Sequence, residues 1–157
     1  MKIPELGRRG GGWVALQSAL FAAIVGCGFA GVYWPPSVEG FLVVLGLALA
    51  LGGAVVLVLG VASLGSSFTP FPRPLEDGAL RQHGPFKHVR HPIYGGVILL
   101  ALGLSAAEAP LGLIPTALLA TLFDLKARRE EAWLDERYPE YADYLRRTPR
   151  RFVPFLY

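Results

Sequence analysis

Charged residues are scarce in this chain of 157 residues. Asp, Glu, Lys and Arg make up 17% of it and hydrophobic residues 53%, whereas soluble domains carry about 25% charged residues. This composition excludes an ordinary soluble fold, and it excludes disorder, which requires low hydrophobicity and high charge. Cysteine is nearly absent as well, and with Cys27 alone the chain forms neither an intrachain disulfide nor a thiol-rich metal site. We expect a single membrane domain over residues 1–157.

Runs without any charge dominate the first half of the chain. They cover residues 13–34 and 40–72, and each exceeds the about 20 helical residues that cross a bilayer core. Two shorter uncharged runs, 92–107 and 109–123, predict a helical hairpin. We therefore expect an all-α integral membrane protein with four transmembrane helices. The expected segments are transmembrane helices at 13–34, 38–64, 92–107 and 110–138, the last with a cytosolic extension, a cytosolic cofactor-binding loop at 66–91 and a C-terminal interfacial segment at 139–157.

Positive charge is missing from one side of this topology. With the N-terminus in the cytosol, all 15 Lys and Arg residues fall on the cytosolic side, and the opposite loops contain only Glu39 and Glu108. Positively charged loops stay in the cytosol, so we expect both termini there, in the inner membrane if the host is a bacterium. Residues 24–27 resemble a lipoprotein cleavage site, but the apolar run is longer than the about 7–15 residues of a signal peptide, which favours an uncleaved helix.

A stripe of small residues marks the second expected helix. Gly46, Gly53 and Gly60 recur every seven residues and therefore lie on one face. Such a face suits close packing against a neighbouring helix. It needs no functional explanation.

Titratable residues gather where the third helix is expected to begin. Pro92 suits the first helical position, so the free N–H groups of that helix face the cytosol and form a site for a carboxylate or phosphate. Arg90 and His91 flank this site, and Tyr94 lies in the first turn of the helix. Their position makes these three residues candidates for function.

The other basic residues of this loop have a simpler explanation. Arg81, Lys87 and His88 fit positive-inside residues that lie near anionic headgroups. His83, His88 and His91 share one loop without a nearby cysteine or carboxylate, so we expect no metal site. We also expect no haem, whose axial ligands would come from facing helices.

A second polar cluster follows the fourth expected crossing. Glu130 and Glu131 form an acidic pair within a basic segment, which suits a cationic ligand group. Tyr138, Tyr141 and Tyr144 are spaced by three residues, which predicts one aromatic face at the bilayer interface. A zwitterionic amino acid needs both an acidic and a basic partner, and aromatic faces stabilise cations such as a sulfonium. S-adenosylmethionine fits this combination.

Two motifs in this half of the chain resemble those of a known family. Residues 84–95, GPFKHVRHPIYG, are similar to the signature G-P-Y-[RK]-x-x-R-H-P-x-Y-x-G of the isoprenylcysteine carboxyl methyltransferase and phospholipid N-methyltransferase superfamily. Glu130, Glu131, Leu134 and the three tyrosines resemble its block E-E-x-x-L-x-x-x-[FY]-G-x-x-Y-x-x-Y. The resemblance implies an integral membrane methyltransferase that binds S-adenosylmethionine and takes lipid-soluble acceptors from the bilayer.

The resemblance also assigns residues to the site. It implies cofactor contacts from residues of both motifs and from Leu80 and Arg81 just before them, and it places Arg147 near the substrate. With Arg90, expected there from its position at the helix start, the cofactor-binding residues are Leu80, Arg81, Phe86, Arg90, His91, Pro92, Ile93, Tyr94, Glu130 and Glu131. Three features depart from the family pattern. Phe86 replaces a tyrosine, Pro139 replaces a glycine, and the tail with Arg150 and Arg151 has one basic residue more than the pattern.

The implied reaction is in-line displacement of the sulfonium methyl group by a nucleophile. Sulfonium departure needs no acid, so the protein chiefly aligns the reactants, an effect worth roughly 7–11 kcal/mol, and we assign no catalytic base. The acceptor is a prenylated thiol or carboxylate, a phospholipid amine or a small volatile thiol. Membrane lipids are further expected partners, and nucleic acid and metal are not.

Two other classes of protein remain as alternatives. A non-enzymatic membrane protein could keep this fold for partner or lipid interaction, but a broken cofactor motif would be expected and both motifs are intact. A transporter would carry charges within its apolar runs to mark a pathway, and these runs have none.

Overall fold

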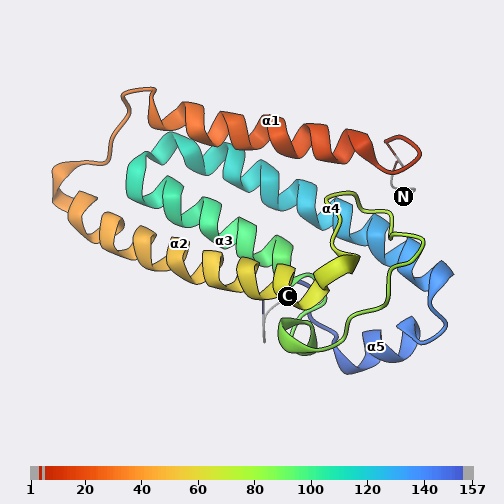
Figure 1. Ribbon diagram of the computed structural model, residues 1–157. Coiled ribbons are helices and arrows are strands. Elements are labelled where there is room, and N and C mark those ends of the chain that lie inside the picture. The colour runs from red at the N-terminus through yellow and green to blue at the C-terminus, as the bar shows by residue number, and fades with distance from the viewer. Residues whose placement is uncertain (1–3, 5, 154–157) are drawn as a thin grey trace.

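The computed structural model describes residues 4 and 6–153, and within that part of the chain every regular element is helical (Figure 1). The all-helical fold class is thereby confirmed. Helices α1, α2 and α4 (with the turn before it) are long and apolar enough to cross a membrane, and α3 is a shorter apolar helix. The elements are α1 Gly11–Gly28, α2 Pro36–Leu64, α3 Pro92–Glu108, α4 Leu113–Arg137, α5 Tyr141–Arg147 and the short 3-10 helices η1 Gly65–Ser67, η2 Gly84–Lys87 and η3 Pro110–Gly112.

Helix α1 ends earlier than the uncharged run predicts. It stops at Gly28, and residues 29–35 form an irregular connection. Gly31 within it has a φ of 71°, in the left-handed region that breaks a helix and that glycine adopts readily. Trp34, the expected helix end, donates its indole N–H to the Ala106 carbonyl on α3 (2.8 Å). Helices α2, α3 and α4 begin and end within three residues of their predicted bounds.

Helices α2 and α3 pack backbone against backbone, because glycines face each other across the contact. A Cβ atom on Gly53 would lie 2.4 Å from the Leu100 nitrogen, and one on Gly46 would lie 2.5 Å from the Gly103 carbonyl oxygen. No side chain fits at these distances. The glycine stripe expected on the second helix is therefore a helix-packing surface.

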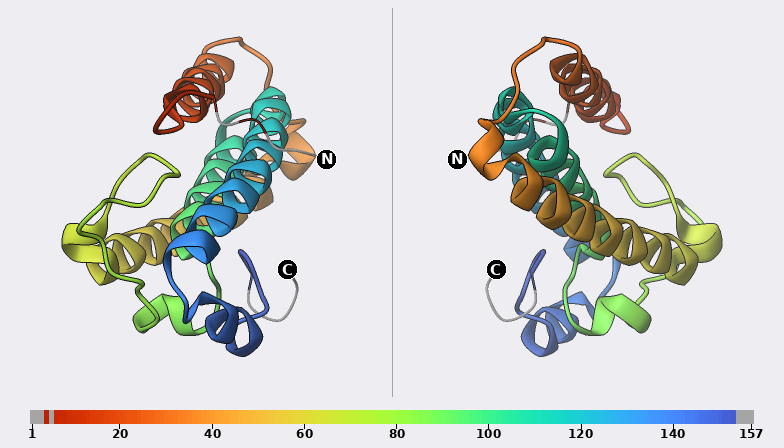
Figure 2. Two further views of the ribbon diagram at one scale, coloured as in Figure 1. Left: turned by 90° about the vertical axis from the view of Figure 1, so that its right-hand side faces the viewer. Right: turned by 90° about the vertical axis from the view of Figure 1, so that its left-hand side faces the viewer.

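Helices α3 and α4 lie between α1 and α2 (Figures 1 and 2). Leu119 and Phe123 of α4 and Ala101 of α3 form the buried centre of the bundle. The outer face of α2 is apolar and open, with Phe41 70% and Val44 71% exposed. Large exposed apolar surfaces mark contact with a membrane or another protein, and here they coincide with helices of membrane-spanning length.

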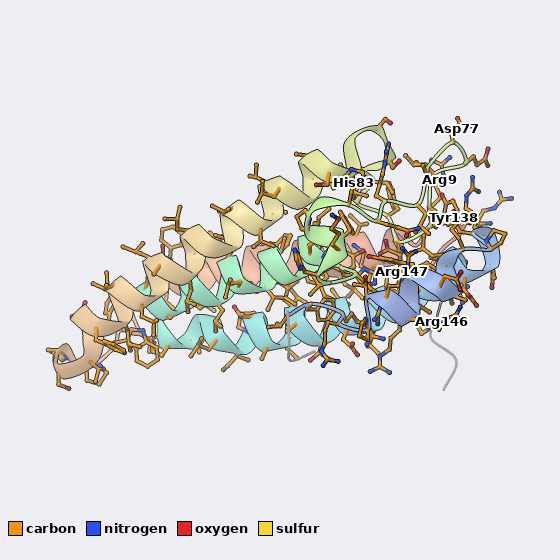
Figure 3. The ribbon with its side chains drawn as sticks, turned by 90° about the horizontal axis from the view of Figure 1, so that it is seen from below. Arg9, Asp77, His83, Tyr138, Arg146 and Arg147 are labelled. Atoms are coloured by element: carbon orange, nitrogen blue, oxygen red, sulfur yellow. The ribbon has the colours of Figure 1, made fainter. Side chains whose placement is uncertain are left out.

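The polar segments gather at one end of the bundle. The loop after η1, the helix η2, the charged half of α4 and helix α5 lie together there (Figure 1), and Figure 3 shows His83, Tyr138 and Arg147 at this end. Gly84 makes the turn into η2 possible, because its φ is 60° and a Cβ atom there would lie 2.6 Å from the Ser63 hydroxyl oxygen. This end of the molecule contains the candidate site.

Candidate functional site

Glu131 is the centre of a cluster of basic side chains. Its Oε1 accepts bonds from Arg90 Nε (2.9 Å) and Arg151 Nε (3.1 Å) and lies 3.1 Å from His91 Nε2, while its Oε2 accepts from Arg151 Nη2 (3.0 Å). Burial alone raises the pKa of the Glu131 carboxyl, but the bonds to His91, Arg151 and Arg90 outweigh it and hold that pKa well below its ordinary range. Glu131 is therefore a carboxylate at neutral pH, and its charge is compensated within the protein.

Glu130 has very different surroundings, although it is the next residue. Its Oε2 accepts a 2.6 Å bond from the Tyr94 hydroxyl and lies 3.8 Å from His91 Nδ1. The Tyr94 ring stacks on His91 on one side and on Phe123 on the other, with ring centroids 5.3 and 4.8 Å apart. Tyr94 is thus fixed in place and orients the Glu130 carboxylate. Adjacent helical residues point about 100° apart, so the two acids have different partners and share only His91.

The C-terminal segment completes the cluster. The backbone N–H groups of Arg90 and His91 donate to the carbonyls of Arg150 and Arg151 (3.0 and 2.9 Å), so the tail runs alongside the start of α3. Arg151 also bonds to Asp124 on α4 (2.8 Å). The sequence marked the extra basic residue only as a departure from the family pattern, whereas the structure gives Arg151 a place in the site.

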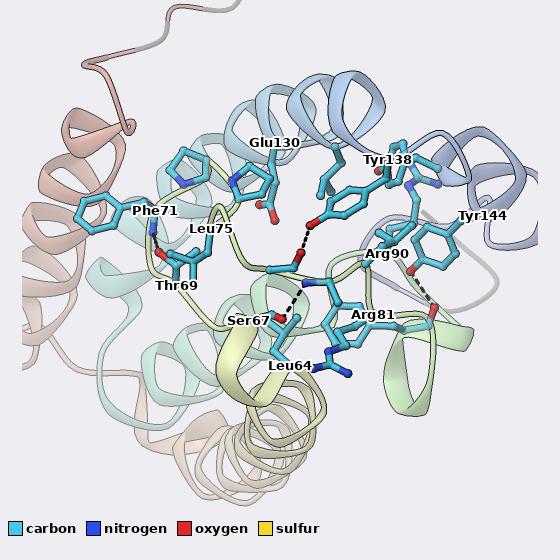
Figure 4. Close-up of a pocket in the computed structure, with 18 residues that line it drawn as sticks. Leu64, Ser67, Thr69, Phe71, Leu75, Arg81, Arg90, Glu130, Tyr138 and Tyr144 are labelled. Atoms are coloured by element: carbon cyan, nitrogen blue, oxygen red, sulfur yellow. Dashed lines mark hydrogen bonds between the residues drawn. The ribbon is translucent and has the colours of Figure 1, made fainter.

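A cavity of about 90 Å³ lies next to this cluster, between the loop, η2, α4 and α5 (Figure 4). The Glu130 carboxylate points inward from α4, with Arg81 on the opposite side. Arg90 also lines the cavity. Acidic and basic side chains from segments about forty positions apart in the sequence thus meet at one cavity, as the topology predicted.

Eight of the predicted site residues lie at or next to this cavity, in two groups. Five of them line it, and His91, Tyr94 and Glu131 lie behind these in direct contact with Arg90 or Glu130. The lining residues among the predicted set are Leu80, Arg81, Phe86, Arg90 and Glu130. Of the lining residues, Arg90 and Glu130 are bonded to this second group and connect it to the cavity.

Other predicted residues lie elsewhere. Pro92 does not line this cavity, and Ile93 packs against Gly60 of α2, where a Cβ atom would lie 2.7 Å from Ile93 Cγ1. Arg147 is exposed and donates to the Gln82 side-chain oxygen (2.7 Å). Within residues 4 and 6–153, no three His, Cys, Asp or Glu side chains form a group that could hold a metal ion.

Three tyrosines that were expected on a membrane-facing surface line the cavity instead. Tyr138 donates to the Gly78 carbonyl (2.6 Å) and Tyr144 to the Phe86 carbonyl (2.8 Å), which fastens the loop to α4 and α5. Tyr141 and Tyr144 are 1% and 3% exposed. The prediction of an interfacial tyrosine face was therefore wrong, because a spacing of three defines a face but not what covers it.

An apolar groove lies on the other side of η2. It has a volume of about 1240 Å³, runs between α2, α3 and α4, and is lined by Leu59, Leu99, Leu102 and other apolar residues. Lys87 and His88 lie at its polar end. Residues 84–90 form a partition, since Phe86 and Arg90 line the cavity whereas Pro85 and Val89 line the groove.

Comparison with known proteins identifies the family of this chain. The phospholipid methyltransferase family model matches residues 40–141. The cobalt-zinc-cadmium resistance protein CzcN of Cupriavidus metallidurans is 38% identical over 81 residues, which is 49% of this chain and 37% of that protein. The nickel-cobalt-cadmium resistance protein NccN of Alcaligenes xylosoxydans xylosoxydans is 34% identical over 71 residues, 44% of this chain and 33% of that protein. The matched part thus spans about a third of either relative. The family model covers most of this chain, which belongs to the phospholipid methyltransferase family.

Proposed function

We propose that this protein transfers a methyl group from S-adenosylmethionine to a lipid-soluble acceptor at the cytosolic face of a membrane. The observation that carries the proposal is the meeting of Glu130 and Arg90 at one cavity. A zwitterionic amino acid group needs a carboxylate and a cation as partners, and Glu130 and Arg90 line the same cavity.

The chain's own groups fit this ligand. Glu130 would hold its ammonium group, and Arg90 would hold its carboxylate. Phe86 and Phe71 give the cavity aromatic walls, which stabilise a nearby cation. Arg81 has a buried Nε atom without a hydrogen-bond partner among the residues described, as expected of a group that awaits a polar ligand. When bound, the cofactor supplies the activated methyl group.

The loop must move for such a ligand to bind. Sites for small molecules occupy about 300–1000 Å³, and this cavity has about 90 Å³. Apart from η2, residues 68–91 form no helix or strand, and the bonds from Tyr138 and Tyr144 tie the loop down at Gly78 and Phe86. We infer that the loop is a cover that shifts outward on binding and excludes water afterwards, which favours displacement at the sulfonium.

The apolar groove suits the acceptor. Its size and lining match a hydrocarbon chain, and its polar end lies against the partition at 84–90, on whose other side the cofactor would sit. This favours a prenylated or acyl-chain acceptor over a small volatile thiol. Among chain-bearing acceptors, a prenylated thiol or carboxylate and a phospholipid amine both fit the proposal.

The protein's contribution to the reaction is alignment. The two carboxylates are held in place by a network of hydrogen bonds and ion pairs before the reactants bind. Its members are Tyr94, His91, Arg90, Glu130 and Glu131. No residue is assigned as a general base, because a carboxylate or thiolate acceptor needs none. A neutral amine acceptor would lose its proton after methylation.

The proposed membrane topology follows from the charge distribution. We infer four crossings, with α3 as the shortest, and both termini in the cytosol, which is the inner-membrane orientation in a bacterium. This places the cavity, η2 and α5 on the cytosolic side, where S-adenosylmethionine is available. The names of the two relatives state a resistance to metals and no reaction, so they neither favour nor oppose methyl transfer.

Cofactor binding tests the proposal. Purified protein in detergent should bind S-adenosylhomocysteine in calorimetry, and Glu130→Gln should weaken binding by at least about tenfold, the value of a charged hydrogen bond. Glu136→Gln is the matched control, since Glu136 is exposed on the same helix. If wild-type protein shows no affinity at millimolar ligand, the non-enzymatic alternative replaces the proposal.

A further inference from the structure

Tyr141 is the one among the three cavity tyrosines whose hydroxyl group makes no hydrogen bond to the described part of the protein. Tyr138 and Tyr144 donate to loop carbonyls. The Tyr141 hydroxyl is buried and has no hydrogen-bond partner in the described part of the chain, although its side chain lines the same cavity. Buried polar groups in native proteins are nearly always paired, and an exception calls for an explanation such as a missing ligand.

The surroundings of Tyr141 show which kind of ligand atom it would meet. It belongs to α5 and lies among the charges of Glu131, Arg90 and Glu130. Burial, and next the Glu131 carboxylate, raise the pKa of the Tyr141 hydroxyl well above its ordinary value. The group therefore stays protonated and is available as a hydrogen-bond donor. Arg90, whose charge lowers that pKa in turn, lines the same cavity as Tyr141.

We propose that the Tyr141 hydroxyl donates a hydrogen bond to the carboxylate of the amino-acid portion of the bound methyl donor, next to the Arg90 guanidinium. The proposal rests on the proposed function and extends it by one binding residue. The outward shift of the loop that the cavity size requires would also make this hydroxyl reachable. Arg81, the second cavity residue with an unpartnered buried atom, lies on the loop and moves with it, whereas Tyr141 belongs to the helical frame.

Tyrosine-to-phenylalanine substitutions separate a binding role from a structural one. Tyr144→Phe removes a hydrogen bond to Phe86 and should lower the thermal midpoint of the ligand-free protein. Tyr141→Phe removes no hydrogen bond within the described protein and relieves the desolvation of an unpaired hydroxyl, so the midpoint should stay the same or rise. In the absence of ligand only Tyr144→Phe is therefore expected to lower the thermal midpoint.

The decisive experiment measures the affinities of wild-type protein and of Tyr141→Phe for two ligands. S-adenosylhomocysteine should bind about tenfold more weakly to the variant, as expected for a lost bond to a charged group. Decarboxylated S-adenosylhomocysteine, which lacks only the carboxylate, should bind equally to both, because the coupling between hydroxyl and carboxylate is then absent.

Other outcomes would overturn the inference in distinguishable ways. Equal affinity of wild type and Tyr141→Phe for S-adenosylhomocysteine, or an equal loss for both ligands, would reject the contact while leaving the proposed function intact. A midpoint of Tyr141→Phe as low as that of Tyr144→Phe would show a structural role instead. Failure of the wild-type protein to bind S-adenosylhomocysteine would reject the proposed function and this contact together.

Discussion

Replacing Glu131 by glutamine should destabilise the protein, whereas the same change at Glu130 should chiefly affect ligand binding. Glu131 is bonded to Arg90, His91 and Arg151, and its side chain is only 14% exposed. Glutamine keeps the shape but removes the charge, which takes the carboxylate from the buried Arg90 guanidinium and leaves Arg151 paired with Asp124. Glu130 has one hydrogen bond to Tyr94 and faces the cavity, so less of the fold depends on it.

The size of the effect follows from the contacts. Breaking a buried ion pair by removing one partner costs about 3–5 kcal/mol. For a chain of this length each kcal/mol lowers the thermal midpoint by about 2–4 °C. Glu131→Gln should therefore unfold roughly 6–20 °C below wild type at neutral pH, and the exposed control Glu136→Gln should unfold at the wild-type temperature.

The dependence on pH gives an independent check. Because the folded-state pKa of Glu131 is depressed, its stabilising contribution is complete above the ordinary glutamate pKa of about 4.3 and is lost as the pH falls below that value. Wild-type protein should lose this contribution in acid, and Glu131→Gln should not. Thermal unfolding in detergent between neutral and acidic pH measures both effects. The reasoning would be refuted if wild type and Glu131→Gln had equal thermal midpoints at neutral pH, or if both lost equal stability in acid.

Three further predictions concern packing, the loop and the groove. Gly53→Ala should destabilise the protein by about 1–3 kcal/mol through overpacking against α3, whereas Gly52→Ala, whose Cβ would lie 3.9 Å from its nearest neighbour, should be neutral or stabilising in chemical denaturation. Tyr138→Phe should increase amide hydrogen exchange around Gly78 about fivefold, as expected for one lost hydrogen bond, and unchanged exchange would show that the loop is held otherwise. Leu102→Trp should block the groove and abolish methylation of a lipid acceptor while cofactor binding persists. The control Leu47→Trp, on the exposed face of α2, should leave both methylation and cofactor binding unchanged. Methylation of a lipid acceptor by the Leu102 variant would exclude the groove as the acceptor site.

The helices could be predicted from the sequence because charge is absent over long stretches. Pro92 marked the start of α3 correctly, and the predicted start of α2 at residue 38 lies two residues after the observed start at Pro36. The end of α1 was misplaced, since residues 29–34 are also uncharged and hydropathy does not separate a helix from an apolar connection. Gly28 and Gly31 were the residues that could have indicated the end of this helix.

The meeting of the two polar segments also followed from the sequence, because the expected topology puts both at one membrane face. The different surroundings of Glu130 and Glu131 did not follow, since they depend on how α4 is rotated against α3. The part played by Arg151 depends on the path of the tail beside Arg90 and His91, a tertiary contact that no local pattern encodes. For the same reason the burial of Tyr141 was missed.

Methyl transfer into lipid tests the central claim most directly. Membranes from cells that produce the protein should be incubated with S-adenosylmethionine carrying a labelled methyl group and then extracted with organic solvent. Label should enter the organic phase with wild-type protein and remain at background with Glu130→Gln, provided that both proteins are folded and equally abundant. No label above background with folded wild-type protein, or equal labelling with both proteins, would contradict the account.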